Sequence, residues 1–147
     1  MNIYIFFLFV VLLFFPNQGT TQTILPEVPR IDAAMAYYKY NAGNTILIDA
    51  MTRETFAKRH ALGAINLSND GPGDLERIMN MELPIPKDKE ILVYCGWTGE
   101  VSSAVLALIL IKKGFKRTFV VKGGDWEMME AGIPWVIDGK IEVFHKR

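Results

Sequence analysis

The sequence predicts an α/β fold in which helices cover both faces of a parallel sheet. Short apolar runs alternate with helical stretches along the chain, which is the pattern of strands joined by helical crossovers. The runs are apolar throughout, as expected of strands that are buried on both faces. One helical stretch, residues 100–113, is itself apolar almost all round and is therefore predicted to lie in the interior. Together these patterns indicate one packed α/β domain.

The elements of the first half follow from capping residues and apolar runs. A helix is expected over residues 31–40, with Gly43 as its C-terminal cap. Thr52 is placed to cap a short helix that ends at Lys58. The other expected elements are a buried strand over residues 45–49, a brief strand over residues 64–67, a short helix within residues 70–80 and a strand over residues 90–94.

The second half continues the same alternation. The apolar helix over residues 100–113 is followed by an expected buried strand over residues 118–121 and a helix over residues 124–131. Trp126 and Met129 lie at helical spacing within this last helix, so both are predicted to pack in the core.

The chain begins with an apolar run over residues 1–15 that ends at Pro16. This run is shorter than the roughly 20 residues that a transmembrane helix needs, and it matches the apolar region of a secretory signal peptide. We therefore predict a signal peptide over residues 1–21 and a mature domain over residues 22–147. The expected protein is exported, either periplasmic or secreted, with no stable membrane insertion after cleavage.

The composition narrows the classes of function. The 147 residues include 16 basic and 16 acidic side chains, and this balance provides no basic surface for nucleic acid. The length after the leader suits one domain. The single cysteine, Cys95, has no partner for a disulfide within the chain. In an oxidising compartment its thiol is therefore predicted to be either buried or chemically used.

Cys95 is predicted to sit where a strand ends and a helix begins. The strand over residues 90–94 stops at the cysteine, Gly96 and Gly99 follow, and the apolar helix then starts. Backbone N–H groups and a helix N-terminus favour a thiolate, and ligands bind in the crevice beyond the carboxyl ends of parallel strands. Cys95 is therefore a candidate nucleophile. The alternative is a buried thiol that acts as a small apolar side chain.

Three ordered blocks of residues resemble the rhodanese-like domain family over nearly all of the mature sequence. The first block runs from a strand that ends in aspartate, residues 47–49, to residues 60–66, His-Ala-Leu-Gly-Ala-Ile-Asn. The second block is the strand that leads into Cys95, together with the helix after it. The third block begins at Gly123 and ends with residues 131–134, Ala-Gly-Ile-Pro.

The resemblance implies a rhodanese-like sandwich over residues 22–147, built on a parallel, about five-stranded sheet. It also implies that Cys95 takes sulfane sulfur from a small sulfur-containing donor and holds it as a persulfide. The sulfur then passes to a thiol acceptor, either a small molecule or a protein, or to cyanide. No metal or organic cofactor is implied. The residues of the implied active loop are Gly96, Trp97, Thr98, Gly99, Glu100, Val101 and Ser102, with Asp49 and His60 in supporting positions.

The supporting residues are expected to be structural. Asp49 is predicted to accept hydrogen bonds from nearby loop N–H groups rather than to bind substrate. His60 is predicted to bond to the backbone and fix a turn rather than to act as an acid or base. Trp97 is either a lid over the thiol or a surface aromatic residue.

Several positions depart from the family pattern. Glu100 stands where an arginine or another polar residue is typical, and a carboxylate near the thiol would oppose its ionisation. Glu100 is expected first of all to act as an acid at a helix N-terminus. Met51 replaces a common arginine, and the segment that begins at Cys95 is slightly longer than usual. Trp97 occupies the place of the second cysteine in a related type of loop.

These departures keep a second function open. The alternative to an exported sulfurtransferase is a non-catalytic module of the same fold that binds a partner or senses sulfane sulfur. A third hypothesis is oxyanion chemistry of the kind performed by related phosphatases and arsenate reductases, whose longer loop ends in an arginine. Glu100 and Val101 provide no such arginine, so this hypothesis ranks last.

Overall fold

The computed structural model describes residues 25–96 and 99–144. The predicted signal peptide over residues 1–21 lies outside the described residues, and so do Trp97 and Thr98 of the predicted active loop. Within the described ranges, no helix is both long enough and apolar enough to cross a membrane.

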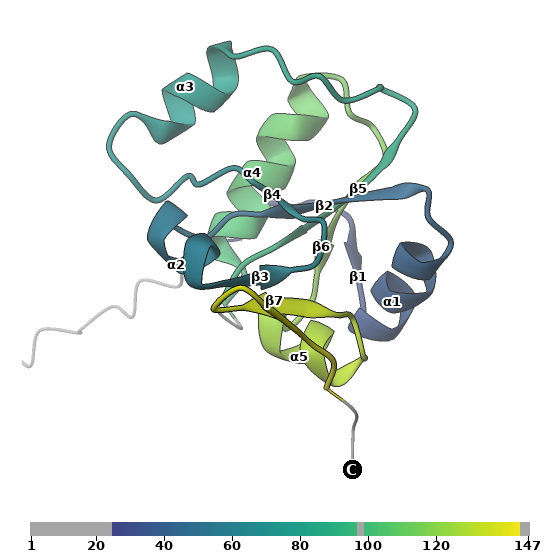
Figure 1. Ribbon diagram of the computed structural model, residues 1–147. Coiled ribbons are helices and arrows are strands. Elements are labelled where there is room, and N and C mark those ends of the chain that lie inside the picture. Colours follow the sequence, from purple (N-terminus) through teal and green to yellow (C-terminus); the bar gives the residue numbers. More distant parts are fainter. Residues whose placement is uncertain (1–24, 97–98, 145–147) are drawn as a thin grey trace, which may run out of the picture.

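Five parallel strands form the main sheet, as the sequence predicts (Figure 1). The central strands β5 and β2 consist mainly of Ile, Leu and Val, and Asp49 lies opposite Tyr94 at their carboxyl ends. Every residue of β5 is buried, as expected of a strand covered on both faces. Across the sheet, the strands are β1 (Arg30–Ile31), β6 (Thr118–Val121), β5 (Glu90–Tyr94), β2 (Thr45–Asp49) and β4 (Ile65–Asn66).

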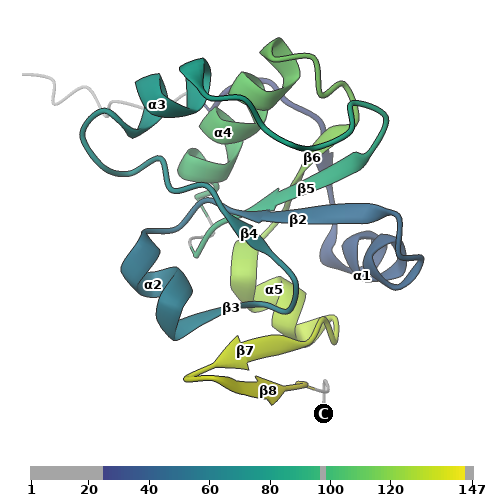
Figure 2. The same ribbon diagram turned by 45° about the horizontal axis from the view of Figure 1, so that its top comes forward.

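Helices cover both faces of this sheet. They are α1 (Ala33–Asn41), α2 (Arg53–Lys58), α3 (Asp74–Asn80), α4 (Val101–Lys112) and α5 (Gly124–Glu130). Figure 2 shows α3 and α4 over one face and α1 and α5 over the other. At the start of α1, the Asp32 carboxylate accepts a hydrogen bond from the Met35 N–H at 2.7 Å. At the start of α2, the Thr52 hydroxyl accepts one from the Thr55 N–H at 3.2 Å. Both bonds satisfy amides that have no partner within their helix.

α4 packs against β5 and β6. Its residues Ala104, Leu106, Ala107 and Leu110 are fully buried, and each buried leucine contributes about 1.5–3 kcal/mol relative to an exposed one. The prediction that this helix is buried all round is confirmed only in part, because Val101 at its start is exposed. The buried side of α4 fixes the position of its N-terminus relative to the end of β5.

A second, three-stranded antiparallel sheet is absent from the predicted elements. It joins β3 (Arg59–Ala61), β7 (Trp135–Ile137) and β8 (Lys140–Glu142). The turn between β7 and β8 contains Asp138 and Gly139, whose φ angles are 47° and 77°. An Asp-Gly pair is the sequence signal of a two-residue hairpin turn with this backbone. That signal locates the hairpin when it is taken together with the apolar residues on either side.

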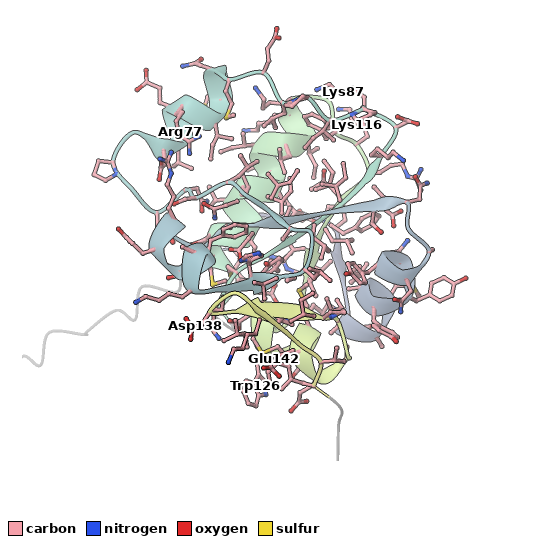
Figure 3. All side chains as sticks on the ribbon, viewed as in Figure 1. Arg77, Lys87, Lys116, Trp126, Asp138 and Glu142 are labelled. Carbon is pink, nitrogen blue, oxygen red and sulfur yellow. The ribbon has the colours of Figure 1, made fainter. Side chains whose placement is uncertain are left out.

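Two details of the prediction are wrong. The first helix begins at Ala33 rather than Ile31, because Ile31 belongs to β1 and Asp32 caps the helix. Trp126 is 62% exposed on α5 and projects from the molecule near the second sheet (Figure 3), instead of packing in the core. Met129 of the same helix is buried, as predicted.

Candidate active site

A cavity of about 340 Å³ lies at the carboxyl ends of β2 and β5. Cys95 directly follows β5 and Met51 lies just after β2, so the parallel register of the two strands brings both residues to one edge of the sheet. This is the crevice in which open α/β sheets bind ligands. The described residues that line it are Met51, Thr52, Thr55, Arg59, Asp70, Cys95, Gly96 and Ser102.

Cys95 lines this cavity but is only 2% exposed. Its Sγ is 3.4 Å from the Oγ of Ser103, which belongs to the first turn of α4. The Cys95 carbonyl oxygen accepts a hydrogen bond from the Asp125 N–H at 3.0 Å. The sulfur atom is thus held beside a helix N-terminus, whose partial positive charge favours a thiolate.

Ser103 is absent from the predicted active loop, which ends at Ser102. The Ser103 Oγ lies 3.4 Å from the Cys95 Sγ and 3.1 Å from the Glu100 carbonyl oxygen. A hydroxyl has one proton and two lone pairs. If Cys95 is a thiol, the Ser103 hydroxyl accepts a hydrogen bond from the S–H group and donates its own proton to the Glu100 carbonyl oxygen. If Cys95 is a thiolate, the hydroxyl donates its proton to the sulfur atom instead. Two adjacent serines in the sequence provide no basis for choosing between them.

Glu100 connects the active loop to β1 and to the turn before α5. Its Oε2 accepts a hydrogen bond from the Arg30 Nε–H at 2.9 Å, and its Oε1 accepts one from the Gly123 N–H at 3.1 Å. Its φ angle of 56° is left-handed, which is uncommon for a residue other than glycine. The side chain makes no hydrogen bond to the first turn of α4, all of which is described, and the expected effect of its charge at the helix N-terminus stays a prediction. The charge of Glu100 is thus paired with Arg30.

Asp49 supports the loop after β2, as predicted. It is fully buried, and its Oδ1 accepts a hydrogen bond from the Met51 N–H at 2.7 Å. Burial raises the pKa of Asp49 to about 6, a rise that the bond from Met51 offsets only in part. Asp49 is not among the described residues that line the cavity, which agrees with a structural role.

His60 makes the kind of backbone contact that the sequence predicts. Its Nδ1 lies 2.7 Å from the Phe56 carbonyl oxygen. Its ring also stacks on the Phe56 ring, with centroids 4.1 Å apart. These contacts join α2 to β3, and His60 is not among the described lining residues of the cavity.

No motif in the sequence marks Arg59, yet this residue lines the cavity. Arg59 begins β3, and its Nη2 lies 2.5 Å from the Asp125 Oδ2. The Asp125 side chain is only 5% exposed, whereas the Arg59 side chain is 40% exposed. The pairing of Arg59 with Ile137 of β7 fixes its backbone here, so its position depends on the sheet that is absent from the predicted elements.

Gly96 lies at the cavity directly after Cys95. A Cβ atom at this position would lie 2.8 Å from the Met51 Sδ and 3.7 Å from the Arg59 Nη2. The first distance is too short for a real side chain, so glycine allows the loop to approach Met51 this closely. Met51 thus forms part of the cavity wall at the position where the resemblance implies an arginine.

The other described residues of the predicted loop do not all reach the cavity. Ser102 lines it, and its hydroxyl donates a hydrogen bond to the Asp70 Oδ1 at 2.7 Å. Gly99 and Val101 are exposed and are not among its described lining residues. Within the part of the chain that the structure describes, no three His, Cys, Asp or Glu side chains come together as metal ligands would.

The chain matches the family model of the Rhodanese-like domain over residues 32–127. It is 35% identical over 115 residues to the tRNA uridine(34) hydroxylase of Acholeplasma laidlawii, a match that covers 76% of this chain and 35% of that relative. The chain thus spans about a third of the length of the hydroxylase. It is also 29% identical over 91 residues to the thiosulfate sulfurtransferase GlpE of Actinobacillus succinogenes, which covers 62% of this chain and 75% of that relative.

Among solved structures, the human single-domain sulfurtransferase TSTD1 is similar, with a TM-score of 0.59 and 17% sequence identity. The alignment covers 71% of this chain and 97% of the human chain. At this identity the likeness shows the fold alone. It agrees with the five-stranded parallel sheet flanked by helices.

Proposed function

Because the chain belongs to the rhodanese-like domain family, we propose that it is a sulfurtransferase that carries sulfane sulfur as a persulfide on Cys95. The observation that carries this proposal is the position of the thiol. Cys95 lines a cavity at the carboxyl end of the sheet, and its Sγ lies beside the first turn of α4. The similarity to a thiosulfate sulfurtransferase supports the same activity. The substrates would be a small sulfur donor and a thiol acceptor.

The proposed reaction has two steps at one sulfur atom. The Cys95 thiol first loses its proton to solvent, and the thiolate attacks the outer sulfur of a donor such as thiosulfate. A bond forms between the two sulfur atoms, and sulfite leaves with the electron pair of the bond that breaks. An acceptor thiolate then attacks the outer sulfur of the persulfide, and Cys95 leaves as a thiolate. Neither step needs an external oxidant or reductant.

Two features near the sulfur atom favour the thiolate in both steps. The N-terminus of α4, which begins at Val101, supplies a partial positive charge. The Ser103 hydroxyl, 3.4 Å from the Cys95 Sγ, supplies a hydrogen-bond donor when the thiol is ionised. Cys95 lines the cavity of about 340 Å³, so a donor has room to approach.

A non-catalytic module that binds a partner or senses sulfane sulfur is a second candidate. It is favoured by the burial of Cys95, which is only 2% exposed, and by the apolar Met51 in the cavity wall. In such a module Cys95 would take up sulfur without passing it to an acceptor.

Turnover separates these two functions. The mature chain is incubated with thiosulfate and cyanide, and thiocyanate is measured for the natural chain and for Cys95→Ser. The proposal predicts thiocyanate from the natural chain and none from the variant. A natural chain that forms the persulfide but transfers it to neither cyanide nor a thiol supports the sensing module. Unchanged turnover in Cys95→Ser contradicts transfer through this cysteine.

We also propose that the chain is exported and loses residues 1–21. The support is the apolar run over residues 1–15 and the small and polar residues that follow Pro16. The location would then be the periplasm or the extracellular space.

A further inference from the structure

We propose that Arg59, a residue outside the predicted active loop, binds the anionic end of the sulfur donor and so makes the site prefer anionic over neutral reagents. This inference rests on the proposed sulfur transfer at Cys95. The cavity contains the thiol of Cys95 and the guanidinium of Arg59 together. None of the steps described above uses this guanidinium.

The guanidinium stands beside the residue that follows the nucleophile. An atom at the Cβ position of Gly96 would lie 3.7 Å from the Arg59 Nη2. The Met51 Sδ would lie 2.8 Å and the Asp125 Oδ2 3.6 Å from the same position, so the guanidinium approaches the loop beside these two side chains, and a glycine is what allows the approach. A donor whose outer sulfur reaches Cys95 has its other end within the cavity that Arg59 lines.

Asp125 holds the guanidinium in place without using all of its donors. The ion pair joins the Arg59 Nη2 to the Asp125 Oδ2, and Asp125 is almost completely buried. Asp125 is itself fixed, because its N–H donates to the Cys95 carbonyl oxygen at 3.0 Å. A guanidinium has five N–H donors in a planar fork, and the 40% exposed side chain of Arg59 keeps some of them available. The arrangement presents oriented donors for the oxygen atoms of an anion.

The other charged residue of the cavity opposes an anion only weakly. Asp70 also lines the cavity, but it is exposed and its Oδ1 accepts the hydrogen bond of the Ser102 hydroxyl. Water and salt screen an exposed carboxylate more strongly than a half-buried guanidinium. We therefore expect Arg59 rather than Asp70 to decide the charge preference of the site.

The same contact stabilises the leaving group. When the Cys95 thiolate attacks the outer sulfur of thiosulfate, the bond to the sulfonate sulfur breaks and its electron pair departs with sulfite. Negative charge therefore grows on the sulfonate oxygens during the step. Hydrogen-bond donors that are already oriented toward these oxygens lower the barrier, so Arg59 is expected to act on donor binding and on the first transfer step.

Alkylation of Cys95 by two reagents that differ only in charge tests this role without any sulfur transfer. Iodoacetate is an anion and iodoacetamide is neutral, and both place one group on the thiolate with loss of iodide. The ratio of their rates is measured for the natural chain, Arg59→Gln and Arg59→Lys. For a pair of charges separated by several ångströms at the edge of the protein, we expect Arg59→Gln to lower the ratio about three- to tenfold. Arg59→Lys keeps the positive charge, so its ratio of rates should stay close to that of the natural chain.

Two further variants separate charge from folding. Lys58→Gln removes one positive charge from the exposed residue next in sequence, and its ratio should match that of the natural chain. Arg59→Gln combined with Asp125→Asn removes both charges of the ion pair, so it leaves no buried carboxylate without a partner. This double variant should also show the lowered ratio.

The steady-state parameters provide the second readout. Arg59→Gln should raise the KM for thiosulfate while its reaction with iodoacetamide stays within about twofold of the natural rate. An unchanged rate ratio in both Arg59→Gln and the double variant, with Cys95 still reactive, overturns the role of Arg59 and leaves the sulfurtransferase proposal standing. A lowered ratio in a chain that accepts no sulfur supports the anion site and contradicts the proposed activity. A Cys95 that reacts with neither reagent overturns both.

Discussion

The Arg30 guanidinium and the Glu100 carboxylate form an ion pair that ties the end of the active loop to the edge strand β1, with 2.9 Å between Nε and Oε2. The second oxygen of the carboxylate accepts a hydrogen bond from the Gly123 N–H at 3.1 Å. One side chain thus joins the loop, an edge strand and the turn before α5. Both partners are largely buried, so their interaction is screened less than that of a surface pair.

Replacing Glu100 by Gln should lower stability more than it changes the reactivity of Cys95. The variant keeps the shape of the side chain but loses the charge that meets Arg30, so we expect a loss of about 1–3 kcal/mol in the free energy of unfolding. Urea denaturation measures this loss. Glu82→Gln, at an exposed residue, is the control and should stay within about 0.5 kcal/mol of the natural chain.

The alkylation rate of the same variant tests the electrostatic expectation drawn from the sequence. An unpaired carboxylate near the thiol would oppose its ionisation, and its removal would then speed alkylation at neutral pH. Because Arg30 already balances the charge of Glu100, we expect the iodoacetamide rate to change by less than about threefold. An increase of tenfold or more would show that Glu100 acts directly on the thiolate.

Ser103→Ala should slow the reaction of Cys95. The variant removes the hydroxyl that lies 3.4 Å from the Cys95 Sγ, and a hydrogen bond to a charged group is worth about 1.5–3 kcal/mol. We expect the iodoacetamide rate at neutral pH to fall at least about tenfold, which is the change that the lower end of this energy range corresponds to. Ser102→Ala is the matched control, because its hydroxyl bonds to Asp70 instead. Equal rates in the two variants would exclude a role for Ser103 in holding the thiolate.

Asp49 should make stability depend on pH between about 4 and 6. Burial raises the pKa of Asp49 above its ordinary value to about 6, so the folded chain binds the Asp49 proton more tightly than the unfolded chain does. Its contribution to stability is therefore fully present below the unfolded pKa and is lost as the pH rises through the folded pKa. A shift of this size corresponds to about 2–3 kcal/mol.

Asp49→Asn removes this contribution while it keeps an oxygen that accepts from the Met51 N–H. Urea denaturation at several pH values between 4 and 7.5 compares the two chains. The stability of the variant relative to the natural chain should rise by about 2–3 kcal/mol over this range. A difference that stays constant with pH would mean that Asp49 keeps an ordinary pKa in the folded chain.

The mature chain should begin near residues 20 to 22. The apolar run over residues 1–15 ends at Pro16, and a signal peptidase cleaves shortly after such a boundary. N-terminal sequencing of the exported protein gives the site directly. Recovery of the intact leader in a membrane fraction would indicate an uncleaved anchor instead.

The main sheet was predictable because its signals are local. Apolar runs such as residues 45–49 mark strands buried on both faces, and Thr52 marks the start of a helix. The second sheet contains only short strands, for which periodicity is weak. The turn at Asp138 and Gly139 was the remaining signal for it.

The candidate site was predictable in part. The place of Cys95 follows from the order of its strand and helix, and the backbone contacts of Asp49 and His60 are of the kind that the sequence predicts. The positions of Arg59 and Ser103 depend instead on tertiary packing. Arg59 reaches the cavity because β3 pairs with β7, and no local pattern in the sequence encodes that pairing.

The ion-pair partner of Glu100 could not be predicted from the sequence for the same reason. Arg30 lies 70 positions earlier in the chain, and the two residues meet because β1 pairs with β6 next to the turn at Gly123. The sequence shows a carboxylate close to the cysteine, but not the cation that neutralises it.

The most direct test of the central proposal is the intact mass of the mature chain after exposure to thiosulfate or a polysulfide. A persulfide on Cys95 predicts the addition of one sulfur atom to the natural chain, its removal by a thiol reductant, and no addition to Cys95→Ser. The Ser102→Ala variant, which keeps the nucleophile, should still gain the sulfur. A natural chain that gains no sulfur from any of these donors, or a Cys95→Ser chain that gains as much as the natural one, would contradict the proposal.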